Sequence, residues 1–252
     1  MELLCEPAVL IGVSPGGPRD RLLTFLTRGQ GGVRLFASRL SRGMTSSRFL
    51  EQLQGGDLVF TRPREGGQAR LISFVPGRVW PGIRADFERT FQAMAFLELV
   101  NLSLTEHAPQ PEIFALLVRF LDRLEGERRP ALARITATVR LLRLCGFAPR
   151  LETCIGCGAA LPGGGRVLFS PEGGGVVCGA CAPLRRETTL PITPGSRGFM
   201  VRAAALPEYQ AFRLRAPAAV EFEISRVIDR HVASHFGAHP RCGAYLERLE
   251  AV

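Results

Sequence analysis

Residues 140 to 182 read RLLRLCGFAPRLETCIGCGAALPGGGRVLFSPEGGGVVCGACA, and two CxxC pairs in this stretch decide the fold around them. Cys154 and Cys157 form the first pair, and Cys178 and Cys181 form the second after 20 intervening residues. This spacing is that of a zinc ribbon, in which each pair presents two thiolates on a tight turn and two pairs complete a tetrahedron. Four thiolates leave no open position for water. The sequence therefore predicts one structural Zn²⁺ ion that stabilises the fold and does not catalyse.

The remaining cysteines support metal binding over disulfides. Cys5, Cys145 and Cys242 are scattered along the chain, and in a reducing compartment this pattern favours a metal site over disulfides. A redox-active CxxC pair is the alternative. Such a motif is single and precedes a helix in a βαβ unit, a context that is missing here.

Ahead of the cysteine pairs, the chain changes from strand-like to helical patterning. Short apolar segments separated by Gly- or Pro-containing turns predict five strands, at residues 8–13, 21–27, 33–39, 58–62 and 69–75. Five strands at this spacing suit a small barrel, either OB-type or SH3-like, and residues 45–54 form a short helix or loop between the third and fourth strands.

After Pro81, apolar residues recur every three or four positions, as on one face of a helix. Helices are expected at about residues 87–100, 112–124, 130–145, 194–205, 218–235 and 242–249. The fold class is therefore α+β, a five-stranded barrel followed by a helical domain with an inserted four-cysteine ribbon. The expected domains are residues 1–80 and 81–252, with the zinc-binding insertion at about 150–185.

The charge of the chain points to a polyanionic partner. The formal net charge is +9, and every positive side chain other than histidine is arginine because the chain contains no lysine. A Walker-type P-loop and Schiff-base chemistry both need a lysine, so neither is expected. The first 80 residues are the most basic third of the chain.

Within that basic third lies a candidate surface for nucleic acid. Phe36 and Phe49 are interleaved with arginines, so that aromatic rings can stack on bases while guanidinium groups contact phosphates. The alternative is that the phenylalanines belong to the barrel core and the arginines are only solvated. The predicted DNA-binding residues are Arg34, Arg39, Arg42 and Arg48.

A second arginine cluster lies on the helix expected at 130–145. Arg134, Arg140 and Arg143 accompany an apolar face, and Arg140 and Arg143 share one side of the helix at i, i+3 spacing. Two guanidinium groups beside an apolar groove suit the grip of a carboxylate on a partner protein. Ordinary helix amphipathicity explains the same pattern.

The sequence offers no starting point for catalysis. His231, His235 and His239 follow helical spacing, but the glutamate of a zinc-protease helix is absent, and polar positions near a helix end explain them more simply. No apolar stretch reaches the roughly 18 residues that a membrane span needs, and Glu2 and Glu6 stand where a secretory signal would carry positive charge. We expect a cytoplasmic protein that is not an enzyme.

The stretch from Arg140 to Ala182 resembles the RecO family of recombination mediators. Members show a leucine-rich helix ending in a Gly-Phe/Tyr-x-Pro turn, a CxxCG knuckle, a Phe-x-Pro strand with paired glycines, and a second CxxC. The matching positions here are Gly146 to Pro149, Cys157-Gly158, Phe169-Ser170-Pro171, Gly173 to Gly175, and Cys178 to Cys181. The family also has an amino-terminal OB barrel before a helical domain that carries the zinc site.

The resemblance implies a non-enzymatic mediator of DNA repair. Such a protein binds single- and double-stranded DNA, anneals complementary strands, works with RecR, and helps to load RecA onto DNA coated by single-strand binding protein. It also recognises the acidic, hydrophobic C-terminal tail of single-strand binding protein, for which Arg134, Arg140 and Arg143 are the candidate contacts here. The resemblance also implies that the protein is located in the bacterial cytoplasm, in association with the nucleoid.

This chain departs from the family pattern at three places. Gly32 stands where a basic residue usually precedes the third strand, that strand ends as Ala37-Ser38-Arg39, and the basic carboxy-terminal element is reduced to Arg241-Cys242-Gly243. These differences affect individual DNA contacts. Some relatives also lack the cysteines, which implies that the zinc is architectural. The rival interpretation is a zinc-ribbon scaffold that binds only proteins.

Overall fold

The computed structural model describes residues 1–16, 20–38, 50–62, 69–105, 108–161 and 167–237 of the 252-residue chain. The chain divides into two compact units, Met1–Gly126 and Glu127–Val252. The change from strand to helix falls at Pro81, as the sequence predicts, whereas the unit that holds the barrel also includes the first three helices. A boundary near residue 80 therefore marks a change of secondary structure, and the compact units divide after Gly126.

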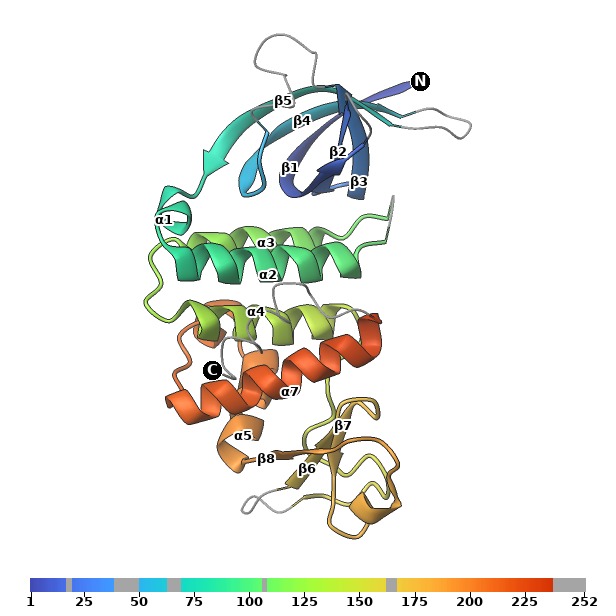
Figure 1. Ribbon diagram of the computed structural model, residues 1–252, viewed down its shortest axis with the longest axis vertical. Helices are drawn as coiled ribbons and strands as arrows, with labels where there is room; N and C mark the ends of the chain where they lie inside the picture. The colour runs from blue at the N-terminus through green and yellow to red at the C-terminus, as the bar shows by residue number, and fades with distance from the viewer. Residues whose placement is uncertain (17–19, 39–49, 63–68, 106–107, 162–166, 238–252) are drawn as a thin grey trace. The chain divides into compact units, whose positions relative to one another are not determined.

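Five strands close the barrel of the first unit (Figure 1). They are β1 (Glu2–Pro15), β2 (Asp20–Thr27), β3 (Gly31–Ser38), β4 (Gln54–Arg62) and β5 (Arg70–Val79). The spatial order is β1-β2-β3-β5-β4, with antiparallel neighbours except for the parallel contact between β3 and β5. This order is that of the OB fold, which settles the choice that strand spacing left open. Before β4 the structure describes residues 50–53, which contain no helix, and residues 45–49 of the expected short helix or loop lie outside the described residues.

Period-two alternation fills the barrel with apolar side chains. Leu23 and Phe25 of β2 face Val33 and Leu35 of β3 in a core that β1, β4 and β5 complete. Gly31, at the start of β3, has φ +66°, and a Cβ there would lie 1.9 Å from the carbonyl oxygen of Ala108. Glycine is therefore required where the segment after the second helix crosses the β2–β3 turn.

Three helices complete the first unit: α1 (Pro81–Arg84), α2 (Phe87–Ser103) and α3 (Pro111–Leu124). The Asp86 side chain accepts a hydrogen bond from the Arg89 backbone N–H at 2.8 Å and so caps α2. Helix α2 packs on β1 and α3 packs on β2. The buried Trp80 indole donates to the Asp122 carboxylate at 2.9 Å, which fastens the end of β5 to α3.

The second unit combines helices with a small sheet. Its helices are α4 (Pro130–Leu144), α5 (Pro194–Ala205), α6 (Glu208–Ala211) and α7 (Ala218–Phe236), and η2 (Ala182–Leu184) is a short 3₁₀ turn. Strands β6 (Val167–Ser170), β7 (Gly175–Val177) and β8 (Leu190–Ile192) form a sheet in the order β7-β6-β8. The sheet thus extends past residue 185, where the inserted ribbon was expected to end. The helix expected at 242–249 lies outside the described residues.

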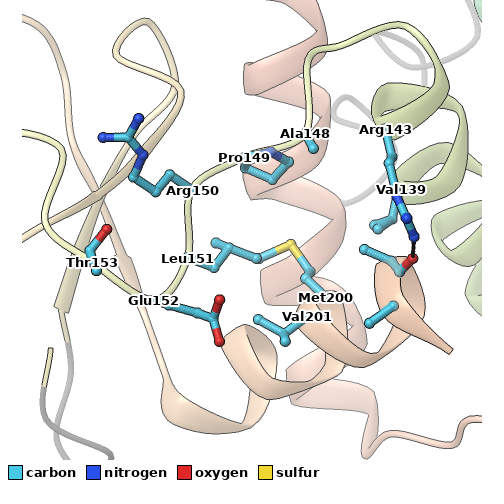
Figure 2. Close-up of a pocket in the computed structure, with 12 residues that line it drawn as sticks. Val139, Arg143, Ala148, Pro149, Arg150, Leu151, Glu152, Thr153, Met200 and Val201 are labelled. Carbon is cyan, nitrogen blue, oxygen red and sulfur yellow. Dashed lines mark hydrogen bonds between the residues drawn. The ribbon is translucent and has the colours of Figure 1, made fainter. Parts of the chain in front are cut away.

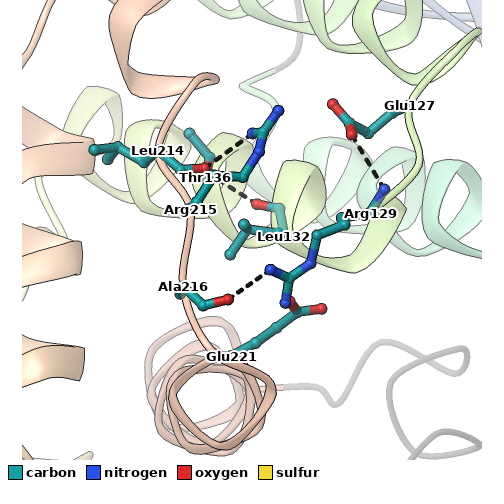
Figure 3. Close-up of polar contacts among 8 residues, drawn as sticks. All are labelled: Glu127, Arg129, Leu132, Thr136, Leu214, Arg215, Ala216 and Glu221. Carbon is teal, nitrogen blue, oxygen red and sulfur yellow. Dashed lines mark hydrogen bonds and ion pairs between the residues drawn. The ribbon is translucent and has the colours of Figure 1, made fainter.

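Helices α4, α5 and α7 pack on one another, and α4 is buried around most of its circumference. Arg129, which precedes α4, donates to the Ala216 carbonyl at 2.6 Å and pairs with Glu221 of α7 at 2.5 Å (Figure 3). This contact joins the beginnings of α4 and α7. Within the described segments, no helix is long and apolar enough to cross a membrane.

Candidate metal centre and basic barrel face

The four cysteines of the two CxxC pairs converge on one point. Their Sγ atoms all lie within 4.8 Å of one another, and those of Cys157 and Cys178 are 3.8 Å apart. A tetrahedron with metal–sulfur bonds of about 2.3 Å has sulfur–sulfur edges of about 3.8 Å. The predicted grouping of Cys154, Cys157, Cys178 and Cys181 is therefore confirmed, with a spacing that fits a tetrahedral metal ion.

Backbone turns fix the position of the first thiol. The Cys154 side chain is buried, and its Sγ accepts hydrogen bonds from the Gly156 N–H at 3.4 Å and the Cys178 N–H at 3.3 Å. A Cβ at position 156 would lie 3.0 Å from the Cys181 Sγ, so glycine keeps the knuckle open. The two pairs therefore depend on each other for their geometry.

The thiols are also coupled in their protonation. The Cys178 N–H lowers the pKa of the Cys154 thiol to about 6, whereas hydrogen bonds with the Cys178 and Cys157 thiols raise the pKa of Cys181 to about 12. The two directions have different causes, because backbone N–H groups stabilise the thiolate at Cys154, whereas the neighbouring sulfur atoms favour the protonated form of Cys181. A divalent cation favours the thiolate form of both. Four thiolates are the donor set of a structural zinc site, with no position left for substrate.

A buried histidine connects the cysteine-bearing sheet to α7. His231 Nε2 lies 2.8 Å from the carbonyl oxygen of Phe147, and Nδ1 lies 3.2 Å from that of Pro171 in the β6–β7 turn. Burial lowers the pKa of His231, and the hydrogen bond with the Phe147 carbonyl opposes this shift only in part. His231 is therefore a polar residue near the end of α7, and the structure adds that it is buried, with 1% of its surface exposed.

The sequence could not distinguish a core histidine from a surface one, because the carbonyl groups of Phe147 and Pro171 that lie beside the His231 ring are far away along the chain. His235 Nδ1 donates to the His231 carbonyl at 2.9 Å, one turn back on the same helix. Among the described residues, the group able to hold a metal contains no histidine. His239 lies outside them.

On the barrel, Arg34 and Phe36 lie on the outer side of β3. Their neighbours Leu35 and Ala37 belong to the core, and alternation turns Arg34 and Phe36 outward. Arg34 is exposed and Phe36 is half-buried. Arg34 and Phe36 therefore share the outer face of β3. The other predicted DNA-binding residues, Arg39, Arg42 and Arg48, lie outside the described residues.

One arginine of this face was not singled out from the sequence. Arg70, the first residue of β5, is paired in register with Phe36 across the parallel β3–β5 contact. Arg70 is exposed. Alternation in residues 69–75 marks it as an outward position, but only the order of strands in the barrel brings it beside β3.

The three arginines of α4 have different surroundings. Arg134 is 5% exposed, pairs with Asp229 of α7 at 3.2 Å and donates to the Ser225 hydroxyl at 3.0 Å. Arg140 donates to the carbonyl oxygens of Ala203 and Leu206 at 3.0 and 2.9 Å. Arg134 therefore holds two helices together, and Arg140 satisfies the end of α5.

Arg143 is exposed and donates to the carbonyl oxygen of Ala204. It stands at a cavity of about 470 Å³ formed by the end of α4, the segment 148–153 and α5. Figure 2 shows Met200 and Leu151 in the apolar part of this cavity, with Arg143 and Arg150 on different sides of it. The structure thus places one of the three predicted partner-binding arginines, Arg143, at an open groove.

Comparisons with known proteins match this architecture. A family profile described as "Recombination protein O C terminal" matches residues 84–241. A protein of Anaeromyxobacter sp. (strain Fw109-5) named "DNA repair protein RecO" is 35% identical over 92% of this chain and 91% of its own length. This chain belongs to the RecO family.

Further RecO proteins extend the match to nearly the whole chain. The "DNA repair protein RecO" of Rubrobacter xylanophilus is 33% identical over 87% of this chain and 86% of its own. That of Desulforudis audaxviator is 29% identical over 96% and 95%. The resemblance seen in residues 140 to 182 is therefore confirmed. The profile includes α2 to α7 and the four cysteines, whereas the barrel precedes it.

Proposed function

We propose that this chain is a recombination mediator in DNA repair that binds single- and double-stranded DNA and anneals complementary strands without catalysing a reaction. Its RecO relatives carry the name of DNA repair proteins. The observation that carries the proposal is the outer face of the OB-type barrel, where the exposed Arg34 stands two residues from the half-buried Phe36. A cation beside an aromatic ring is suited to phosphate and base together.

The mechanism is electrostatic. Two DNA strands repel each other, and a protein with a net charge of +9 concentrates both on one basic surface and offsets that repulsion. Base pairing then completes the duplex without help from a reactive side chain. Binding depends little on nucleotide sequence and weakens steeply with salt, because neutralised phosphates release counterions. Arg39, Arg42 and Arg48 belong to the same proposed surface.

The metal in this proposal is one structural Zn²⁺ ion held by Cys154, Cys157, Cys178 and Cys181. When bound, the ion supplies cross-linking of the two knuckles, and the cysteines alone hold it. Its support is the sulfur spacing that fits metal–sulfur bonds of about 2.3 Å. Elemental analysis of purified protein should give one zinc per chain. A second equivalent of metal would instead revive a role for the histidines.

We propose two protein partners, RecR and the acidic C-terminal tail of single-strand binding protein. With RecR, the protein promotes the loading of RecA onto single-stranded DNA that single-strand binding protein coats. The cavity of about 470 Å³ at the end of α4 is our candidate for that tail, since its lining combines Arg143 and Arg150 with apolar side chains and contains one carboxylate, Glu152. Of the three arginines that the sequence singled out, Arg134 is buried in its pairing with Asp229, and Arg140 donates to the carbonyl oxygens of Ala203 and Leu206. We therefore assign the tail contact to Arg143.

Strand annealing with purified protein tests the function. Two complementary oligonucleotides, one carrying a fluorophore and the other a quencher, should anneal faster with the protein at low salt than without it. Charge reversal of Arg34, Arg39 and Arg42 together should abolish the acceleration. A protein-only scaffold would not accelerate annealing in the first place, so a wild type without acceleration, unchanged by the triple substitution, would favour that rival. Bacterial cells should place the protein in the cytoplasm, at the nucleoid.

A further inference from the structure

A row of side chains crosses all five strands on the outer surface of the barrel. Strand register places Leu22 of β2 opposite Phe36 of β3, and Phe36 beside Arg70 of β5. The row continues from Arg70 to Thr61 of β4 and from Thr61 to Leu3 of β1. Residues directly opposite each other on neighbouring strands have Cβ atoms about 5 Å apart. The five side chains are therefore contiguous.

Alternation shows that this row faces solvent and not the core. In each strand, a neighbour of the row residue packs in or against the barrel core; these neighbours are Leu4, Leu23, Leu35, Phe60 and Leu71. The row itself is accessible: Arg70 is exposed and Leu3 is 67% exposed. An aromatic ring, an arginine and two leucines therefore form a belt on the outside of the barrel.

On its Arg34 side, the belt is followed by an outward row whose charge has the same sign, whereas the row on its other side includes Asp20 of β2. On the Arg34 side, the next outward positions include Thr24 and Arg34 on the β2–β3 pair and Val59 and Cys5 on the β4–β1 pair. Arg34 and Arg70 are the charged residues of these positions, and no carboxylate occurs among them. Arg34 lies two residues along β3 from Phe36, about 6.6 Å, and Arg70 lies one strand away, about 4.8 Å.

Among the described residues, Arg70 differs from Arg62 in that its guanidinium has no hydrogen-bond or ion-pair partner. Arg62, one strand away, donates to Gln30 and pairs with Glu2 at 3.2 Å. An exposed guanidinium beside an aromatic ring keeps all its donors for a ligand.

We infer that Arg70 contacts DNA and that Phe36, between Arg34 and Arg70, is the base-stacking position of the same site. This inference rests on the proposed function and deepens it, because it gives a single strand a path across β2, β3 and β5. The two guanidinium groups bind phosphates on either side of the base that stacks on Phe36. The leucines and Thr61 continue the platform for neighbouring nucleotides.

The test uses the full chain and a fluorescein-labelled oligo-thymidine strand, with fluorescence anisotropy measured over a salt series. Arg70→Gln should reduce the slope of log affinity against log salt by about 0.7, the value for one phosphate contact on a single strand. If Arg70→Gln and the wild type bind equally at 1 M salt, this difference in slope makes the variant bind about eightfold more weakly at 50 mM salt. Arg70→Lys should retain the slope because it keeps the charge.

Phe36→Leu should behave differently, because it removes a stacking surface and no charge. Affinity should fall about tenfold while the salt slope stays unchanged. An oligonucleotide with abasic sites should erase this difference between Phe36→Leu and the wild type, yet preserve the effect of Arg70→Gln. The two substitutions therefore separate the phosphate contact from the base contact within one site.

Arg28→Gln is the matched control. Arg28 is an exposed arginine on the β2–β3 turn, at the end of β3 far from Phe36, and its loss removes the same charge. An equal loss of slope in Arg28→Gln would overturn the inference in favour of general attraction. Wild-type binding that Arg70→Gln leaves unchanged would also overturn it, without touching the proposed function. Failure of the wild type to bind any DNA would remove both.

Discussion

The cysteine cluster and the barrel face carry the two chemistries of this molecule, and they are encoded in different ways. The four cysteines lie in one stretch, on turns whose shape follows from CxxC spacing and from glycines such as Gly156. Phe36 and Arg70 belong to strands that are far apart along the chain and meet across the parallel β3–β5 contact. A site made by local turns is visible in the sequence, whereas a site made by strand order appears only with the fold.

We expect the largest effect from disruption of the cysteine cluster. Binding of structural zinc supplies on the order of 10 kcal/mol, comparable with the whole stability of a domain. Chelation of the metal, or Cys154→Ser, should therefore unfold the sheet of the second unit and remove its cooperative transition in calorimetry. Cys5→Ser, at an exposed thiol on β1, is the control and should change the melting temperature little.

Annealing provides the second readout of that experiment. If the barrel binds DNA independently, the metal-free protein should retain residual annealing per folded molecule. Annealing that depends on free zinc in solution would contradict an architectural role for the metal.

The next largest effect is a difference in stability between substitutions of Arg134 and Arg143, which the sequence placed in one cluster. Arg134→Ala leaves Asp229 half-buried without its partner and should destabilise the second unit by about 3 kcal/mol or more. Arg143→Ala, at an exposed side chain, should cost less than about 1 kcal/mol and should instead weaken binding of an acidic peptide. Denaturant unfolding and peptide titration measure the two effects. Equal destabilisation by both substitutions would contradict the division into a buried arginine that stabilises the fold and an exposed arginine that binds a peptide.

These arginines show what the sequence could and could not reveal. Helical periodicity predicted α4 at 130–145 and thereby the shared side of Arg140 and Arg143. It gave no information on what these arginines contact. Asp229, which pairs with Arg134, and the carbonyl of Ala203, which accepts from Arg140, lie on helices more than sixty residues away along the chain. The same limit explains why the barrel class stayed open between OB-type and SH3-like, and why Arg70 was passed over.

A smaller effect concerns the contact between the cysteine-bearing sheet and α7. Burial lowers the pKa of His231 in the folded chain below the value of about 6.5 expected after unfolding. The unfolded chain therefore binds more protons below pH 6.5, and the free energy of unfolding should fall as the pH decreases from that value toward the folded pKa.

Denaturant unfolding at several pH values measures this dependence. His231→Gln should flatten it, whereas Ser234→Ala, one turn along at an exposed position of α7, should leave it intact. A pH dependence that survives in His231→Gln would assign the proton to another group and would leave the connection between sheet and helix unexplained.

The most direct test of the central claim is strand annealing by the wild type and by Arg34→Glu, each with its zinc content and melting temperature measured on the same sample. We expect the wild type to accelerate annealing at low salt, and Arg34→Glu to lose most of this acceleration while zinc content and stability stay unchanged. Acceleration that is equal in the two proteins, or that does not decline with salt, would contradict the claim.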